Sequence, residues 1–236
     1  MNYKHLRRMK IGIIVAMAKE LELLKPHLQN MSVEVNHDTT FYCGSMGKHD
    51  IVAMQCGIGK VNAAVGTVTM IDNFSPQLVI NTGVAGGASQ RVNVMDLVVG
   101  AQVCYHDVWC GFDGVTPHGQ VQGLPLYFEG ADIVIDNIDE RPGLHCGLIV
   151  SGDQFIDSIE QVDAIKRNFP AALAVDMESG AIAQTCYLRK TPFVSMRIIS
   201  DSPGASHDNS QQYSDFWADA PAHTLEVVKE LLQKLD

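Results

Sequence analysis

The sequence predicts an α/β fold in one domain, and three observations support this prediction. Short apolar runs alternate along the chain with longer amphipathic segments, which is the pattern of strands joined by helices. The length of 236 residues suits a single α/β domain. No internal repeat, low-complexity tract or linker interrupts residues 9–236. We therefore expect one domain over 9–236, preceded by an extension over residues 1–8 whose order the sequence leaves open.

The first expected elements are a buried strand and a helix. Residues 10–17, KIGIIVAM, are almost entirely apolar, as expected of a strand that is buried on both faces. Residues 18–28 place leucines at near-helical spacing. Farther along, the same patterns predict strands over 39–45 and 50–57, a helix over 59–74, a strand over 76–83 and a strand-rich segment over 92–105.

A long segment rich in glycine, proline and aromatic residues, 107–130, separates the two halves of the chain. Segments of this length without secondary structure are usually functional in compact domains, so we expect a functional loop here. The second half is predicted to contain a strand over 144–153, a helix over 158–169, a helix over 177–189, a strand over 192–200 and a terminal helix over 210–235 with a kink at Pro221.

The amino-acid composition argues against several kinds of binding partner and indicates the cellular compartment. The net charge is −10, from 17 basic and 27 acidic residues, whereas a nucleic-acid footprint needs clustered lysine and arginine. The basic residues within Lys4–Lys10 are interpreted as a solvated arm. The six cysteines show no CxxC or zinc-site spacing, and no apolar run reaches the roughly 20 residues of a membrane span. We expect a cytoplasmic protein that binds no metal, nucleic acid or membrane.

Small and acidic residues follow the apolar runs where the predicted strands end. Ligands of open α/β sheets bind beyond the carboxyl ends of the strands, so these residues are candidates for one shared pocket. They are Glu20, Gly57–Lys60, Thr82–Gly87, Ser151–Phe155, Asp176–Glu178, Ser200 and Asp201. Neither glycine-rich stretch has the spacing of a P-loop or of a dinucleotide fingerprint.

Each candidate also has a purely structural interpretation. Glu20 suits a helix N-terminus, the glycines suit tight turns, and Asp201 suits a loop cap. Arg197 lies inside an apolar strand and needs a carboxylate partner if it is buried, for which Glu20 and Glu178 are the obvious candidates. We favour a structural role for the pair His106–Asp107, because neighbouring strand residues point to opposite faces.

A series of motifs runs from about Lys10 to the C-terminus. They are KIGIIVAMAKELELL, GIGKVNAA, INTGVAGG, YHD, IVSGDQFI, NFPAALAVDMES, AIA and RIISD. In this combination the chain resembles the 5′-methylthioadenosine/S-adenosylhomocysteine nucleosidases, which belong to the nucleoside phosphorylase superfamily. The resemblance implies a three-layer α/β/α sandwich around a mixed, partly closed central sheet. It also implies a homodimer whose partner subunit completes each pocket, and an enzyme without a metal or organic cofactor.

The reaction that the resemblance implies is hydrolysis of the N-glycosidic bond of a 5′-thio-substituted adenosine, which releases adenine and a thioribose. Carried over by position, Asp201 is the general acid at adenine N7, and Ser200 orients it. Glu20 positions and deprotonates the attacking water, Arg197 helps to hold the water and the carboxylates, and Glu178 binds the ribose hydroxyls. These roles suit the chemistry, because adenine leaves more easily when protonated and carboxylates stabilise the positive charge that grows on the sugar.

The resemblance also implies which residues line the substrate pocket. Phe155 stacks on the adenine, the backbone of Ile156 reads its edge, and Met177 lies against the ribose. Further lining residues are Met17, Ile58, Val84 and Tyr213. Val84 stands where the family often has serine, which removes a hydroxyl group near the ribose. The acidic run that usually follows the first strand is reduced to Glu20.

Three other functions stay open at this point. A purine nucleoside phosphorylase needs arginines or a Gly/Ser nest for phosphate, whereas Glu20 and Val84 stand at those places here. A futalosine-type nucleosidase would use the same acid and base. A non-catalytic nucleoside-binding protein could share the fold, but it would not need Glu20 and Asp201, which are both present.

Overall fold

The computed structural model describes residues 8–36, 38–139, 141–202, 216 and 223–235. The predictions for residues 1–7, for Tyr213 and for a kink at Pro221 lie outside these described residues. Arg8, at the end of the predicted N-terminal extension, donates from Nε to Oδ2 of Asp50 at 2.8 Å. The division of the chain at residue 9 stays a prediction.

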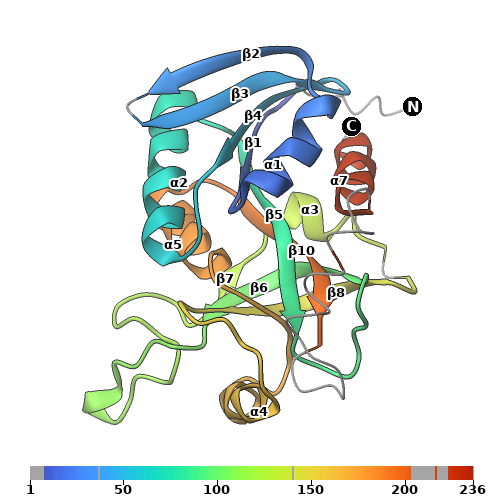
Figure 1. Cartoon of the computed structure of the whole chain (residues 1–236). Helices are drawn as coiled ribbons and strands as arrows, with labels where there is room; N and C mark the ends of the chain where they lie inside the picture. The colour runs from blue at the N-terminus through green and yellow to red at the C-terminus, as the bar shows by residue number, and fades with distance from the viewer. Residues whose placement is uncertain (1–7, 37, 140, 203–215, 217–222, 236) are drawn as a thin grey trace, which may run out of the picture.

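A single mixed sheet occupies the middle of the molecule (Figure 1). Its strands are β1 (Lys10–Val15), β2 (Gln29–Asn36), β3 (Thr39–Met46), β4 (His49–Gln55), β5 (Leu78–Gly87), β6 (Leu97–Tyr105), β7 (Phe128–Glu129), β8 (Leu144–Ser151), β9 (Ala172–Asp176) and β10 (Phe193–Asp201). In β10 every residue is buried, and in β1 every residue after the first is buried. Strands that are covered on both faces show continuous apolar runs instead of alternation, which is why the sequence reveals them.

Part of the sheet closes into a ring of paired strands. β5 pairs in parallel with β10 along one edge, while its other edge pairs first with β1 and then, at Gly86 and Gly87, with β9. Because β10 also pairs with β6, β6 with β8 and β8 with β9, these strands form a closed ring with β5. Strands β1, β4, β3 and β2 extend from the ring as an open sheet. The predicted mixed, partly closed sheet is confirmed.

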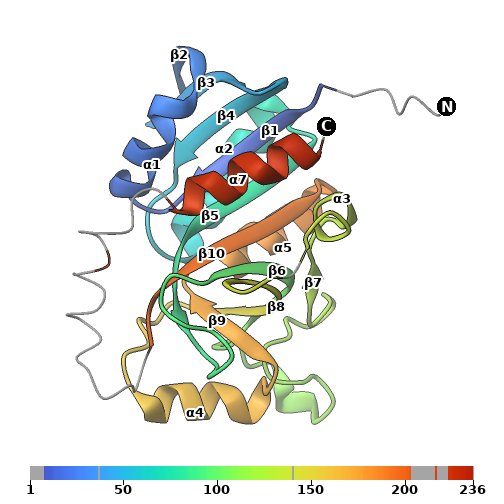
Figure 2. The ribbon, with the colours of Figure 1, turned by 90° about the vertical axis from the view of Figure 1, so that its right-hand side faces the viewer.

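Helices cover both faces of the sheet and complete three layers. They are α1 (Ala18–Leu24), α2 (Lys60–Phe74), α3 (Asp132–Ile135), α4 (Ile159–Asn168), α5 (Ser179–Arg189) and α7 (His223–Lys234). α2 and α5 lie side by side on one face, on the left of Figure 1, whereas α1, α3 and α7 cover the other face (Figures 1 and 2). α4 packs over β8 and β9. The predicted α/β/α sandwich is therefore confirmed.

Three local features differ from the sequence prediction. The edge strand β2 was not predicted, because nearly all of its residues are exposed and no apolar pattern marks it. β5 continues to Gly87, so the glycine-rich stretch that suggested a tight turn lies mostly inside a strand. Helix α1 ends at Leu24, before a short 3-10 helix over Lys25–His27 that contains Pro26, because proline disfavours continuation of an α-helix.

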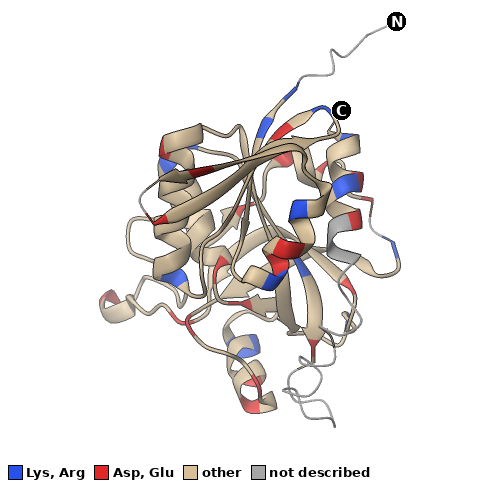
Figure 3. Ribbon diagram, turned by 45° about the horizontal axis from the view of Figure 1, so that its top comes forward, with Lys and Arg blue, Asp and Glu red and all other residues tan. Residues whose placement is uncertain are grey.

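Among the described residues, none of the helices is long and apolar enough to cross a membrane. In Figure 3 the acidic and basic residues lie mainly on helices, loops and strand ends, and the central strands carry few of either. Arg197 of β10 is a charge inside a central strand, and it is only 1% exposed. A buried charge of this kind requires compensating partners, and these partners lead to the candidate site.

Candidate active site

A cleft lies at the ends of β1, β5, β9 and β10. Together with the open solvent at its mouth, it contains about 630 Å³ of empty space. It is lined by Ala16, Met17, Glu20, Ile58, Val84, Ala85, Gly86, Gln154, Phe155, Ile156, Val175, Asp176, Met177, Glu178, Ser200 and Asp201. The described residues to which the resemblance gives a role all line this cleft except Arg197, which is buried against two of the lining carboxylates. Of the strand-end ranges that the sequence offered, 57–60, 82–87 and 151–155 line it only in part, through Ile58, residues 84–86, Gln154 and Phe155.

Glu20 lies in the first turn of α1 and is 8% exposed. Its Oε2 accepts the backbone N–H groups of Ala16 at 3.0 Å and Met17 at 2.9 Å, and its Oε1 accepts the N–H of Val84 at 3.3 Å. Burial raises the pKa of Glu20, while the charge of Arg197 and these backbone donors oppose the rise. The carboxylate therefore stabilises the N-terminus of its own helix and also lines the cleft.

Glu178 is the residue before helix α5, and its side chain is held from two sides. Oε1 accepts the backbone N–H of Gly59 at 3.0 Å, and Oε2 lies 3.9 Å from Nη2 of Arg197. Burial and the neighbouring Asp176 carboxylate raise the pKa of Glu178 to about 7, against the opposing effect of Arg197. The neutral form of this carboxyl group is therefore easier to reach than that of a solvent-exposed glutamate.

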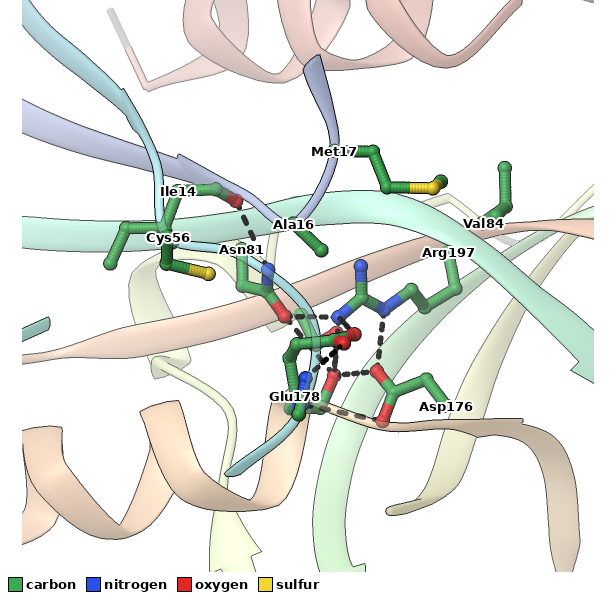
Figure 4. A network of polar contacts seen from close by, with 12 residues as sticks. Ile14, Ala16, Met17, Cys56, Asn81, Val84, Asp176, Glu178 and Arg197 are labelled. Carbon is green, nitrogen blue, oxygen red and sulfur yellow. Dashed lines mark hydrogen bonds and ion pairs between the residues drawn. The ribbon is translucent and has the colours of Figure 1, made fainter. Parts of the chain in front are cut away.

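A buried polar network holds the guanidinium group of Arg197 (Figure 4). Its Nε donates to Oδ2 of Asp176 at 2.6 Å, and its Nη2 donates to Oγ of Ser179 at 3.1 Å and to Oδ1 of Asn81. Asn81 donates in turn from Nδ2 to the carbonyl oxygen of Ile14 at 3.0 Å. Three strands and the start of α5 thus fix the position of this cation.

The carboxylates around Arg197 outnumber it. Burial lowers the pKa of Arg197, but Asp176, Glu178 and Glu20 raise it by more, so the guanidinium keeps its charge. The sequence indicated Glu20 or Glu178 as the partner of Arg197, whereas the closest ion pair is formed with Asp176. The excess of negative charge beside the cleft suits a ligand that becomes positively charged.

Asp201 ends strand β10 and presents one carboxyl oxygen without a partner. Its Oδ1 accepts the hydroxyl proton of Ser200 at 2.6 Å, while its Oδ2 is buried and has no hydrogen-bond partner among the described residues. Burial raises the pKa of Asp201, and the bond from Ser200 opposes this rise only in part. A buried oxygen of this kind is satisfied when the carboxyl group is protonated and donates to a ligand.

Gly83 of β5 is the position where the backbone comes closest to these charged groups. A Cβ atom there would lie 2.5 Å from Nη1 of Arg197 and 2.6 Å from Oε1 of Glu20. Both distances are well inside van der Waals contact, so a side chain at this position would push the cation and the carboxylate out of place. The glycine is required here by close approach and not by a turn.

The sequence interpretation missed the supporting polar residues. Asp176 was noted at a strand end without a role, and Asn81 and Ser179 were not singled out. Asn81 could have been found, because a lone amide within the apolar run LVIN needs partners when it is buried. The contacts of Ser179 link helix α5 to β5 and β10, and such pairings across the fold leave no local signal in the sequence.

The arrangement combines a carboxyl donor and a carboxylate cluster in one partly apolar cleft. Phe155 and Ile58 line it as half-exposed apolar side chains, and half-exposed rings and aliphatic chains suit the face of a flat ligand. Asp201 at one part of the lining can release a proton, while Glu20 at another can accept one. The geometry is suited to acid–base chemistry on a small, partly aromatic molecule.

Comparison with known proteins places the chain among enzymes. Residues 10–233 match the family model described as the phosphorylase superfamily. The chain is 39% identical over 231 residues to a 5′-methylthioadenosine/S-adenosylhomocysteine nucleosidase of Staphylococcus aureus, with 95% of this chain and 100% of the relative covered. It is 37% identical over 238 residues to the nucleosidase of the same name from Hydrogenovibrio crunogenus, with 96% and 99% covered.

Solved structures agree with these relatives. The nucleosidase of Streptococcus pneumoniae with the transition-state inhibitor MT-ImmA superposes with a TM-score of 0.90 at 34% identity, over 97% of this chain and 100% of that one. The nucleosidase of Colwellia psychrerythraea in complex with adenine gives a TM-score of 0.90 at 35% identity, with 97% and 96% covered. The chain therefore belongs to the phosphorylase superfamily and, within it, to the 5′-methylthioadenosine/S-adenosylhomocysteine nucleosidases, a family of N-glycosyl hydrolases.

Proposed function

We propose that the protein hydrolyses the N-glycosidic bond of 5′-methylthioadenosine and of S-adenosylhomocysteine, and that it releases adenine and a 5′-thioribose. The names of its relatives give these two substrates, and solved relatives hold adenine or a transition-state inhibitor. Within this chain the proposal depends most on one observation: the carboxyl groups of Asp201 and Glu20 line the same cleft. Both groups can therefore reach one bound nucleoside.

Asp201 acts on the leaving base in this proposal. Its protonated carboxyl group donates to N7 of adenine while the electron pair of the glycosidic bond moves into the purine. Since Ser200 bonds Oδ1, the unpartnered Oδ2 is the oxygen left for the base. Protonation lowers the barrier because adenine is a poor leaving group as an anion, and a positioned acid contributes about 10²–10⁴-fold.

Glu20 acts on the opposite side of the bond. It accepts a proton from a water molecule whose oxygen attacks C1′ of the ribose, and Glu178 holds the ribose hydroxyls. Arg197 does not line the cleft, so its part is to hold the carboxylates from behind the lining. The carboxylates beside Arg197 stabilise the positive charge that develops on the sugar. The proton given by Asp201 leaves with adenine, and Glu20 takes one from the water, so the number of protons in the site is unchanged. Glu20 then loses its proton to solvent and Asp201 regains one before the next turnover.

The remaining lining residues bind the two parts of the nucleoside. Phe155 stacks on adenine and the backbone of Ile156 reads its edge, while Met177 lies against the ribose; all three line the cleft. Met17, Ile58 and Val84 line it as well. The contribution proposed for Tyr213 falls outside the described residues.

Phosphorolysis would need an anion site where Glu20 now lies. Backbone N–H groups that could bind phosphate, those of Ala16, Met17 and Val84, already donate to the Glu20 carboxylate. A phosphate brought to these donors would meet a negative charge instead of free hydrogen-bond donors. Water is therefore the better nucleophile for this site.

The purified protein is expected to release adenine from 5′-methylthioadenosine at the same rate with or without added phosphate, and with or without a chelator. Chromatographic separation of adenine measures this rate directly. A rate that depends on phosphate, with 5-methylthioribose 1-phosphate as the product, would establish phosphorolysis instead. S-adenosylhomocysteine, 5′-deoxyadenosine and aminofutalosine in the same assay identify the preferred 5′ substituent, and a failure to cleave any of them would reject the enzymatic proposal.

We also propose a homodimer whose partner subunit completes the mouth of the cleft. The exposed faces of α2 and α5, which lie side by side in Figure 1, carry apolar side chains. The loop after β6 adds Trp109, Phe112 and Val115, which are 65%, 84% and 83% exposed. Large apolar side chains gathered in this way are typical of protein interfaces.

Light scattering of the purified protein is expected to give twice the mass of one chain. Val61→Asp places a charge on the exposed apolar face of α2 and should shift the protein toward the monomer. Val33→Asp, on the exposed edge strand β2, serves as the matched control and should leave the dimer intact. A monomeric wild-type protein that still turns over nucleoside would refute the dimer.

A further inference from the structure

A charged cluster outside the catalytic network joins three segments that line or adjoin the cleft. Nζ of Lys60 lies 2.9 and 2.8 Å from the two carboxylate oxygens of Asp107. Oδ2 of Asp107 also accepts the backbone N–H of Asp153 at 2.9 Å. Oδ1 of Asp153 accepts the backbone N–H of Lys60 at 2.8 Å. The contacts form a closed triangle, so each residue is held by the other two.

The triangle lies next to a hydrogen bond that reaches Glu178 in the cleft. The residue before Lys60 is Gly59, whose N–H donates to Oε1 of Glu178 at 3.0 Å. Gly59 and Lys60 form the turn that leads into helix α2. Their two consecutive backbone N–H groups thus bind two carboxylates, Glu178 in the cleft and Asp153 in the triangle. Phe155, which lines the cleft, follows Asp153 by two residues. The placement of this turn therefore affects the orientation of Glu178.

The backbone at Gly59 is shaped for this contact. Its φ of 91° lies in the region that favours glycine. A Cβ atom there would also lie 3.0 Å from Oδ1 of Asp153. Asp153 and the turn approach more closely than a side chain at residue 59 would comfortably allow.

The ion pair in the triangle is partly shielded from water. The side chains of Lys60 and Asp107 are 25% and 15% exposed. Burial raises the pKa of Asp107, but Lys60 and the N–H of Asp153 lower it by more, so the carboxyl group is ionised. Partly buried pairs are screened less by salt than surface pairs, and here one ammonium group contacts both oxygens of the carboxylate.

We propose that Lys60, Asp107 and Asp153 are positioning residues that hold the Gly59 N–H against Glu178 and so set the affinity of the site for the ribose half of its substrate. The inference rests on the proposed function, because it assigns the ribose hydroxyls to Glu178. The bond from Gly59 occupies Oε1 of Glu178, while Oε2, which lies 3.9 Å from Nη2 of Arg197, is the oxygen proposed to accept from the sugar. Loss of the triangle would let the turn move and the carboxylate rotate, while the adenine contacts remain.

The test is Lys60→Met, which removes the charge and keeps most of the side-chain length. The KM for 5′-methylthioadenosine is expected to rise about tenfold, the effect of weakening a hydrogen bond to a charged group. The kcat should change by less than about threefold, because Lys60→Met leaves the carboxylates beside Arg197 in place and the hydroxyl contact that it weakens is made in both ground and transition states. The Kd for adenine, measured by calorimetry, should stay as in the wild type.

Two further variants separate positioning from general stability. Lys60→Arg retains the charge and should restore the wild-type KM. Lys234→Met breaks an ion pair of 2.9 Å with Asp139 far from the cleft and should leave KM unchanged. A wild-type KM in Lys60→Met, or an equal loss of nucleoside and adenine binding, would overturn the proposal. Absence of adenine release by the wild-type protein would instead reject the proposed function, which the wild-type arm tests separately.

Discussion

Asp201→Asn is expected to lower kcat for 5′-methylthioadenosine by about 10²–10⁴-fold, the contribution of a positioned general acid. The amide keeps the shape of the carboxyl group and still accepts the hydrogen bond from Ser200 through its oxygen. Its nitrogen replaces the unpartnered Oδ2 and can bind the purine, but it cannot transfer a proton. Binding of a nucleoside inhibitor should therefore be retained in part while turnover is lost.

The pH dependence of the rate gives a second measurement of the same role. Burial raises the pKa of Asp201 above its ordinary value, so the acid stays protonated at higher pH than a free aspartate. Activity should fall as pH rises through this raised pKa, because the ionised form has no proton to give, and Asp201→Asn should lack this alkaline loss. Asp163→Asn, an exposed position on α4, is the matched control. Near-normal turnover by Asp201→Asn would show that another group protonates the base.

Glu20→Gln is expected to lower kcat by about 10²–10³-fold, because the amide cannot accept a proton from water. Substrate binding should change less, since the proposed stacking and ribose contacts come from other residues. The substitution also has a structural cost. The amide oxygen can keep the bonds from Ala16 and Met17, but the amide nitrogen then faces the N–H of Val84, and one donor left unsatisfied costs about 1–3 kcal/mol.

The structural cost requires a stability measurement beside the kinetic one. Thermal unfolding with and without adenine shows whether Glu20→Gln is folded and still binds the base. Glu22 is an exposed residue of the same helix that bonds only Lys25 among the described contacts, so Glu22→Gln controls for a loss of charge in α1. A folded Glu20→Gln protein that retains wild-type kcat would move water activation to a different carboxylate, for which Asp176 and Glu178 are the candidates, since both line the cleft and contact Arg197.

The strands that form the cleft were predictable from the sequence because they lie in the buried centre of the sheet. β1 and β10 are covered on both faces, so they appear as apolar runs, and the polar residues at their ends, Glu20 and Asp201, stand out against them. β2 was not predictable because an exposed edge strand has no buried face that requires apolar residues, so its sequence shows no apolar pattern. Ring closure through β5, β9 and β10 also left no signal, since it depends on pairings between distant segments.

The residues of the site also divide into those that the sequence revealed and those that only the folded structure revealed. The family resemblance supplied positions that carry chemistry, and the structure brings those within its described residues to one cleft, together with the guanidinium behind it. It did not supply Asp176 as the main partner of Arg197, nor the Lys60 triangle. Both depend on distances between side chains of different elements. Their amino-acid types are ordinary for surface or strand-end positions, so only the assembled fold gives them a role.

Gly83 has a consequence for how active sites are recognised. It bears no functional group, yet the space above its backbone is where opposite charges of the site come together. Added bulk at this residue would displace both the base Glu20 and the guanidinium group of Arg197, and so would alter the electric field around the reaction. A search for active-site residues by chemical type would miss such a glycine. A scan that measures the activity of substituted proteins would find it, because substitutions at Gly83 would reduce activity as substitutions of the acidic residues do.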